Sequence, residues 1–384
     1  MTVQISRSRV VAFRVAAQGL RRDAADLHEL TVLDVGVQQA MGHPAALAFA
    51  ARLPDAADVD PPVGPGKDLA LVWTLRGAPH VHRRRDLDEL AAALVPLSEA
   101  DATTRLNETG PSIRHAGLSA FEQYDLAVRE LRAVVSKRTE KGAASTAVTR
   151  RLPDAMRREC RTCRTRHISD SAMRSVFLAA GLELEPDTSP PVLRRRSRAR
   201  LPTQADRHAL GELARRYLAV LGPASAADFA DHLGARRADV ADVWPEDFES
   251  VTVDGRPLQV AQDDLDALRS AERPQLVRLL GPFDPYLQAG DRSLIVPDKG
   301  RHKALWPVLG RPGAVLVDGE IAGVWRTKSV TDKSTINRSA TTRLTLTVEP
   351  FGRMTKATWT QVEAEAVRVG RARGVDDVAV TRTT

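Results

Sequence analysis

Hydrophobic and polar positions recur with helical spacing over the first two thirds of the chain. Residues 6–20 place apolar side chains three and four positions apart with arginines between them, which predicts an amphipathic helix capped by Ser6. A second apolar run, 32–37, stops at two adjacent amides, Gln38 and Gln39, and a helical pattern resumes over residues 46–53. The two amides therefore lie at a junction between packed elements.

The chemistry of this junction has two interpretations. A glutamine side chain offers a carbonyl acceptor and an NH2 donor without carrying charge, so Gln38 and Gln39 could hold a water or the edge of a base. Alternatively, both amides satisfy backbone groups where one helix stops and the next begins.

The order of predicted elements recurs along the chain. Short helices are followed by a β element, and this is the order of a winged-helix unit. The expected segments are 6–20, 46–53, 69–75 and 86–97; then 119–135, 139–148, 170–180 and 182–185; then 205–221, 226–233 and 238–243. Recurrence of one plan is better support for this fold than any single copy.

The period changes to that of strands near the end of the chain. Residues 314–317 and 320–326 flank Asp318-Gly319, a type I′ signal that predicts a β-hairpin. Leu344, Leu346 and Val348 alternate with threonines as a third strand, and residues 358–369 predict a closing helix.

We therefore predict an α+β protein with tandem winged-helix (helix-turn-helix) units and a β-rich C-terminal domain. A chain of 384 residues is long enough for two to four domains. The expected divisions are 1–117 for a first winged-helix unit that holds the Gln-Gln stretch, 118–200 for a second unit and a basic linker, 201–272 for a third unit, and 273–384 for the β-rich domain.

The charge of the chain indicates a possible binding partner. The net charge is +7, and arginine-rich chains suit polyanions because the guanidinium group matches phosphate oxygens. A genome rich in G and C would also raise the arginine content. The proline-bounded run 190–202 contains five arginines, and we expect a linker that either is merely charged or follows a DNA backbone. These five are Arg194, Arg195, Arg196, Arg198 and Arg200.

Several classes of function lack support. No apolar stretch approaches about 18 residues and no secretion leader is visible, so we expect a soluble, cytoplasmic protein with no membrane partner. No phosphate-binding glycine loop, His-Glu-x-x-His motif or spaced Ser/His/Asp signature occurs, so we expect neither a nucleotide cofactor nor proteolysis.

The two cysteines do not form a disulfide framework. Cys160, Cys163 and His167 have the spacing of half a structural zinc site, with His115 or an acid as a possible fourth ligand. The alternative is a pair of reduced, partly buried thiols. We assign no metal and no cofactor.

The chain resembles the winged-helix DNA glycosylases of the AlkZ/YcaQ type along nearly its whole length. The resemblance is carried by the motifs Gly36-Val-Gln-Gln, Ala50-Ala-Arg52-Leu, Arg76-Gly-Ala-Pro-His80, Tyr217-Leu-Ala-Val-Leu-Gly-Pro-Ala, Asp228-Phe-Ala, Phe283-Asp-Pro-Tyr, Asp291-Arg292, His302-Lys303-Ala-Leu-Trp-Pro, 313–325 and Val348-Glu-Pro-Phe. Members carry Gln-x-Gln or Gln-x-Asp where this chain has Val37-Gln38-Gln39-Ala40, so the spaced pair is absent here.

The resemblance implies a monofunctional glycosylase that hydrolyses the N-glycosidic bond of bulky N-alkylated purines, in some members including interstrand crosslinks. On this basis we assign catalysis to Gln38 and Gln39, with Gln39 as the first choice to hold the water, and expect a monomer that acts on double-stranded DNA. The assigned DNA-binding residues are Arg52, Arg76, His80, Arg194, Arg195, Arg196, Arg292 and Lys303. The alternatives are a non-enzymatic DNA-binding regulator or protective protein and, third, a zinc-stabilised interaction module.

Overall fold

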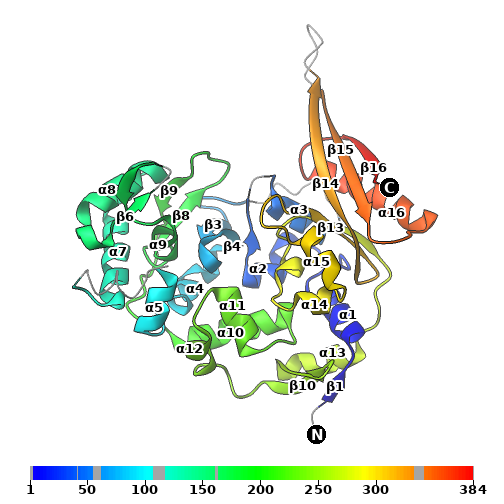
Figure 1. Cartoon of the computed structure of the whole chain (residues 1–384), viewed down its shortest axis with the longest axis horizontal. Helices are drawn as coiled ribbons and strands as arrows, with labels where there is room; N and C mark the ends of the chain where they lie inside the picture. The colour runs from blue at the N-terminus through cyan, green and yellow to red at the C-terminus, as the bar shows by residue number, and fades with distance from the viewer. Residues whose placement is uncertain are drawn as a thin grey trace.

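The computed structural model describes residues 3–40, 42–54, 62–106, 117–160, 163–332 and 341–383 (Figure 1). The helices used below are α1 (Arg7–Ala17), α2 (Val32–Val35), α3 (Pro44–Ala50), α4 (Leu87–Ala93), α5 (Glu99–Arg105), α7 (Ala120–Val134), α8 (Lys141–Arg151), α9 (Asp170–Ser175), α10 (Arg207–Leu221), α11 (Ala226–Leu233), α12 (Arg237–Ala241), α13 (Leu265–Ser270), α14 (Arg292–Ile295), α15 (His302–Leu305) and α16 (Lys356–Arg371). The short 3-10 turns η2 (Leu75–Gly77) and η6 (Pro285–Gln288) also enter the description.

The strands are short except in the C-terminal region. They are β1 (Val3–Ile5), β2 (Val37–Gln38), β3 (Leu69–Trp73), β4 (Pro79–Arg83), β5 (Thr139–Glu140), β6 (Arg158–Cys160), β7 (Thr165–His167), β8 (Leu182–Glu185), β9 (Val192–Arg195), β10 (Glu249–Val253), β11 (Arg256–Val260), β12 (Val277–Leu280), β13 (Gly313–Val317), β14 (Glu320–Asp332), β15 (Thr341–Pro350) and β16 (Asp377–Arg382).

Helices followed by a hairpin occur three times; the sequence pattern predicts the helices of all three units and a β element in the first two, but neither β9 nor the hairpin of the third unit. The hairpins are β3–β4 after α1 to α3, β8–β9 after α7 to α9, and β10–β11 after α10 to α12. The first two hairpins join one sheet of strand order β2-β4-β3-β8-β9-β5, in which Leu71 is paired with Leu184. This sheet therefore crosses the division expected between residues 117 and 118.

The segment expected as a basic linker has a different structure. Val192–Arg195 is strand β9, which pairs with both β8 and β5. Val192 and Leu193 are buried, so the apolar start of this segment packs into the sheet while the arginines follow it. The N-terminal strand β1 belongs to the first unit by sequence but pairs in parallel with β10 of the third unit.

The C-terminal region is the expected β-rich domain. Its sheet has the order β12-β13-β14-β15-β16, and α16 packs on it around Trp359, Val362 and Ala366. Asp318 and Gly319 have φ of +50° and +90° and close the β13–β14 hairpin, as the type I′ signal predicts. Strands β14 and β15 extend beyond the body of the molecule (Figure 1). The α+β class with tandem winged-helix units and a β-rich C-terminal domain is thus confirmed.

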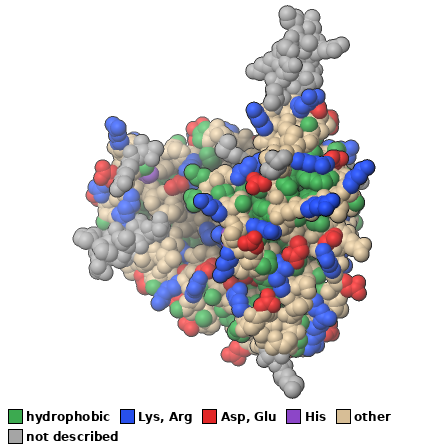
Figure 2. Space-filling model, turned by 45° about the vertical axis from the view of Figure 1, so that its right-hand side comes forward, with side chains coloured by type: hydrophobic (Ala, Val, Ile, Leu, Met, Phe, Trp, Pro, Cys, Tyr) green, Lys and Arg blue, Asp and Glu red, His purple; other side chains and the backbone are tan. Residues whose placement is uncertain are grey.

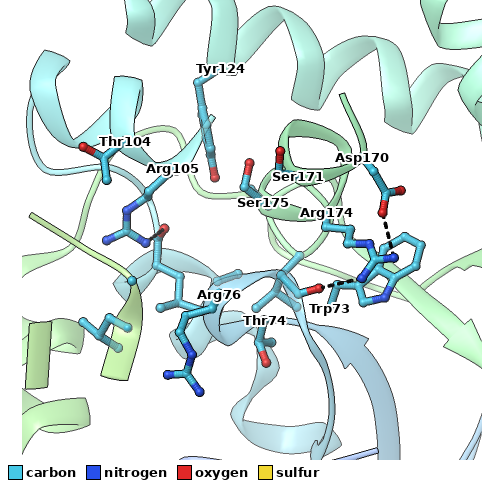
Figure 3. Close-up of a pocket in the computed structure, with 17 residues that line it drawn as sticks. Trp73, Thr74, Arg76, Thr104, Arg105, Tyr124, Asp170, Ser171, Arg174 and Ser175 are labelled. Carbon is cyan, nitrogen blue, oxygen red and sulfur yellow. Dashed lines mark hydrogen bonds and ion pairs between the residues drawn. The ribbon is translucent and has the colours of Figure 1, made fainter. Parts of the chain in front are cut away.

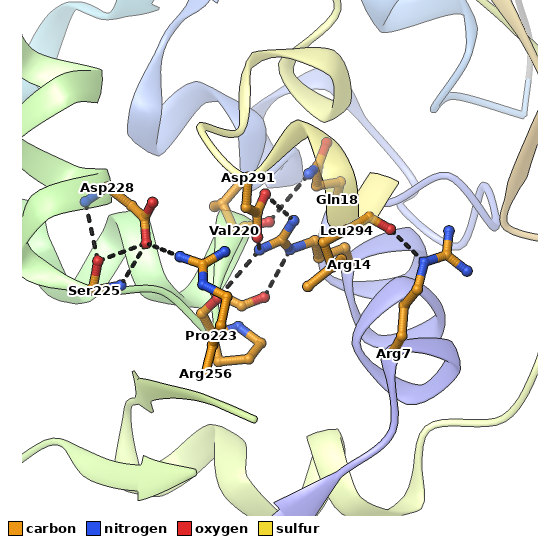
Figure 4. Close-up of polar contacts among 11 residues, drawn as sticks. Arg7, Arg14, Gln18, Val220, Pro223, Ser225, Asp228, Arg256, Asp291 and Leu294 are labelled. Atoms are coloured by element: carbon orange, nitrogen blue, oxygen red, sulfur yellow. Dashed lines mark hydrogen bonds and ion pairs between the residues drawn. The ribbon is translucent and has the colours of Figure 1, made fainter. Parts of the chain in front are cut away.

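Buried arginines hold these parts together. Arg14 of α1 pairs with Asp291 at 2.8 Å and donates to the carbonyls of Gly222 and Pro223 (Figure 4). Its side chain thereby joins the first unit to the third unit and to the C-terminal region. None of the helices in the described part of the chain is both long and apolar enough to cross a bilayer.

Candidate functional site

Gln38 lies on β2 directly opposite His80 of β4. The approach of the two strands depends on Gly36, because a Cβ at that position would lie 2.3 Å from Cε1 of the buried His82 ring. Gly36 also has a φ of +83°, a conformation that glycine adopts without strain. The motif that precedes the glutamines therefore fixes where Gln38 sits.

Gln38 lines a small cavity of about 10 Å³, which is room for about one water molecule. The other lining residues include Arg76, His80, His232, Phe283 and Gln288. Nδ1 of His232 and Nε2 of Gln288 are buried without a hydrogen-bond partner. Within the described residues, the Gln38 amide also makes no hydrogen bond. Three polar side chains from distant parts of the chain thus line one cavity with hydrogen-bonding capacity unused.

The Gln39 side chain, in contrast, makes a hydrogen bond to the start of a helix. Its Oε1 accepts a hydrogen bond from the backbone N of Ala45 at 3.3 Å, in the first turn of α3. The N-cap residue of that helix, His43, makes no side-chain capping bond. Gln39 therefore supplies the acceptor that the helix start would otherwise lack.

The histidines around the small cavity are neutral. Burial and the neighbouring His82 and Arg76 hold the pKa of His80 well below its ordinary value. Burial together with Arg76 lowers the pKa of His232 to about 3, and burial together with Arg83 does the same for His82. Thr74 contacts both His80 and His82, through Nδ1 at 3.0 Å and Nε2 at 3.2 Å.

Arg76 lies between this cavity and a larger one. The larger cavity measures about 380 Å³, the size of a small-molecule site (Figure 3). Its wall includes Trp73 and Thr74 from the end of β3, Tyr124 of α7, and Asp170 and Arg174 of α9. Arg174 stacks 5.2 Å from the Trp73 ring centre, and its guanidinium pairs with Asp170 at 2.7 Å.

Arg76 is the first of three neighbouring arginines. Burial and the nearby charge of Arg311 lower the pKa of Arg76, and burial and Arg292 lower that of Arg311. Arg311 stacks on Phe283, and Arg292, which is exposed, stacks on Trp306. Arg76 and Phe283 both line the small cavity, so Arg76 and the Arg311 stacked on Phe283 lie beside it.

Two arginines that the sequence analysis assigns to DNA binding are buried. Arg52 has no exposed surface, pairs with Asp284 through two 2.8 Å bonds, and also donates to Gln18 and to the carbonyl of Ala48. Arg196 is 6% exposed and pairs with Asp88 at 2.9 Å. Neither guanidinium can reach a phosphate in this conformation, because its charge is neutralised inside the protein.

The other assigned residues occupy varied positions. His80 is buried at the small cavity, whereas Lys303 of α15 is exposed. Arg194 lies 3.8 Å from Glu185, and Arg195 is exposed but donates to the backbone carbonyl of Arg132. Lys and Arg side chains are spread over the face shown in Figure 2, where several surround a hydrophobic patch below the extended strands.

The cysteine motif is also assembled. The ligand atoms of Cys160, Cys163 and His167 all lie within 4.8 Å of one another. His115, the suggested fourth ligand, lies outside the described residues.

Sequence reasoning missed three residues of the site, which are His232, Gln288 and Arg311. His232 and Gln288 belong to α11 and η6, and no local pattern marks either position. Arg311 lies shortly after the His302-Lys303 motif, and in a chain so rich in arginine nothing in the sequence distinguishes it from the other arginines.

Comparison with known proteins agrees with this architecture. A family model described as "DNA glycosylase AlkZ-like" matches residues 32–372. Among solved structures, the fold is similar to that of Streptomyces sahachiroi DNA glycosylase AlkZ, with a TM-score of 0.73 and 19% sequence identity over 99% of this chain and 100% of that chain. No curated protein matches the sequence. Because the family match covers most of its length, the chain belongs to the AlkZ-like DNA glycosylase family.

Proposed function

We propose that this protein is a monofunctional DNA glycosylase that hydrolyses the N-glycosidic bond of N-alkylated purines. The observation that carries the proposal is the small cavity lined by Gln38, His232 and Gln288, because the Gln38 amide makes no hydrogen bond within the described residues and the other two each have an unpartnered nitrogen. Family membership supports a reaction on alkylated DNA, and the cavity supplies groups able to hold one water.

The polar groups of this cavity suit a reactive substrate. No carboxylate occurs among the described residues that line it, and its imidazoles are weak bases with strongly lowered pKa values. Strong general-base catalysis therefore cannot be supplied there. A purine alkylated at N7 or N3 is cationic and leaves without prior protonation, so the enzyme needs only to orient a water and stabilise charge on the sugar.

The reaction balances without a covalent enzyme intermediate. The bond from the sugar C1′ to the purine breaks, and its electron pair neutralises the cationic base. A water oxygen held by the amide oxygen of Gln38 forms the new bond at C1′, and its proton passes to solvent. The products are the free alkylated base and an abasic site, and no lysine nucleophile takes part.

Duplex DNA binding in this proposal rests on Arg76, Arg292, Arg311 and Lys303. Arg76 lines the small cavity, Arg311 stacks on Phe283 in its wall, and Arg292 and Lys303 are exposed on α14 and α15. Guanidinium groups at these positions would hold phosphates on either side of the damaged nucleotide. Arg52 and Arg196 have no place in this set because both are buried in ion pairs.

The larger cavity gives a reason to expect bulky substituents. It shares Arg76 with the small cavity, and its volume of about 380 Å³ exceeds what a methyl group would need. Trp73, Tyr124 and Leu178 give it aromatic and apolar walls against which an extended alkyl group would pack.

The test is incubation of the purified protein with duplex DNA that carries a single N7-alkylated guanine, followed by quantification of free base and abasic sites. We expect release of the alkylated base, faster for a bulky substituent than for a methyl group. Tight binding to the same duplex without release of base would favour a DNA-binding regulator or protective protein. The observation that favours this regulator or protective protein is the absence of the spaced Gln-x-Gln pair.

A further inference from the structure

The hairpin β6–β7 holds a cluster of side chains that the proposed reaction does not use. Cys160 ends β6, His167 ends β7, and Cys163 lies in the turn between them. Their ligand atoms lie within 4.8 Å of one another, and Cys163 Sγ is 3.1 Å from His167 Nε2. Two sulfurs and one imidazole nitrogen therefore converge on a single point.

The histidine ring is oriented for coordination. His167 Nδ1 lies 2.6 Å from the backbone oxygen of Ile168. Because a carbonyl oxygen only accepts, Nδ1 carries a hydrogen, which leaves Nε2, on the side of the Cys163 sulfur, as the nitrogen available to a metal. A backbone carbonyl that fixes the tautomer of a histidine is the usual outer partner of a metal-bound imidazole.

The hairpin is short and has no buried strand residue. Its strands pair over three positions and form a two-stranded sheet separate from the others. The six strand residues are Arg158, Glu159, Cys160, Thr165, Arg166 and His167, and none is buried. Arg166 pairs with Asp154 and Arg158 donates to the carbonyl of Ala155, but a two-stranded hairpin without an apolar face is marginal in water, so a further cross-link would stabilise this one.

We propose that Cys160, Cys163 and His167 bind a structural Zn²⁺ ion. Thiolate and imidazole ligands select zinc among the common divalent ions, and a gap of two residues lets both cysteines reach one ion. A water or another donor would complete the tetrahedron. Binding releases the two thiol protons, so uptake of the metal is accompanied by acidification.

The position of the site gives the ion a structural consequence. Ile168 N bonds Thr149 of α8, and Ser169 caps α9 immediately afterwards. Helix α9 contributes Asp170 and Arg174 to the wall of the larger cavity. A metal at His167 would therefore fix the start of the helix that forms one side of that cavity. This proposal does not depend on the glycosylase activity.

The experiment uses the full-length protein and the metal alone. Protein dialysed against chelator and reductant is titrated with Co²⁺ and then Zn²⁺, and bound metal is measured by elemental analysis. We expect one Co²⁺ per chain with a thiolate charge-transfer band in the near ultraviolet, loss of that band when Zn²⁺ displaces Co²⁺, and slowed reaction of both thiols with Ellman's reagent. Because the chain has two cysteines in all, the band can arise from no other thiols.

Variants separate the site from fortuitous binding. Cys163→Ser and His167→Ala should each reduce bound zinc to below one tenth of the wild-type amount, whereas His208→Ala, an exposed histidine away from the hairpin, should keep it. Circular dichroism of each variant checks folding. The absence of a cobalt–thiolate band in the folded, reduced wild type would overturn the proposal, as would a band unchanged in Cys163→Ser.

Discussion

Replacing each of the two adjacent glutamines with alanine separates catalysis from helix capping. The Gln38 amide makes no hydrogen bond within the described part of the chain and lines the small cavity, whereas Gln39 accepts from Ala45 N. We therefore expect Gln38→Ala to lower base excision by roughly 10² to 10³, the scale for one polar contact to a transition state. Its melting temperature should stay nearly unchanged, because no bond in the folded state is lost.

Gln39→Ala should show the opposite pattern. Loss of a single 3.3 Å bond at the first turn of α3 is expected to cost about 1 kcal/mol of folding free energy. In a protein of this size that is a shift in melting temperature of about 2 °C or less. Excision should fall only a few-fold, through a less rigid α3.

The assay is single-turnover release of the alkylated base from a duplex oligonucleotide, with thermal unfolding and DNA affinity measured on the same preparations. Single-turnover conditions keep product release from masking the chemical step. The reasoning is refuted if Gln39→Ala loses excision by a factor of 10² or more while Gln38→Ala excises normally. In that case Gln39 would leave α3 on binding DNA, and the capping bond would describe only the free protein.

Three further predictions concern charge. Arg52→Met should cost about 3–5 kcal/mol in urea unfolding, because Asp284 would stay buried without its partner; a loss below 1 kcal/mol would contradict the role of this pair. His82 and His232 have a pKa of about 3 in the folded protein against about 6.5 in the unfolded chain. Below pH 6.5 the unfolded chain therefore binds protons that the folded protein does not, and the free energy of unfolding should fall with decreasing pH by up to about 1.4 kcal/mol per pH unit for each ring. His82→Asn should flatten this slope in unfolding measured from pH 7 to pH 4. Affinity for duplex DNA should decrease steeply with salt, and Arg292→Gln should reduce the log–log slope by about 0.9, whereas an affinity independent of salt would remove the nucleic-acid interpretation.

Elements governed by local chemistry were predictable from the sequence. Helix α1 begins after Ser6, whose side chain accepts from Arg9 N, and the Asp318-Gly319 turn needs the positive φ values that its residues tolerate. In both cases the deciding interaction joins residues three positions apart or fewer. The same local signals predict the helices of the three units, whereas strand β9 and the β10–β11 hairpin were not predicted from them.

Features governed by distant partners were not predictable. The residues of β9 are rich in arginine and follow two prolines, which favours a linker, yet pairing with β8 and β5 makes them a strand. Gln38 and Gln288 are 250 positions apart in the chain, and only the packed structure brings them to one cavity. The sequence could therefore mark the Gln-Gln stretch without showing which amide is free.

The buried arginines explain how such distant residues are kept together. Arg52 follows α3, the helix whose start Gln39 caps, and its partner Asp284 caps η6, the turn that carries Gln288. All five N–H groups of Arg52 have hydrogen-bond acceptors. Because a buried charge needs all of these partners, the ion pair favours one arrangement of the two segments. Part of the basic charge that suggests DNA binding is thus used inside the protein. We therefore expect Arg52 to act on the proposed reaction through the placement of the small cavity and not through contact with a phosphate.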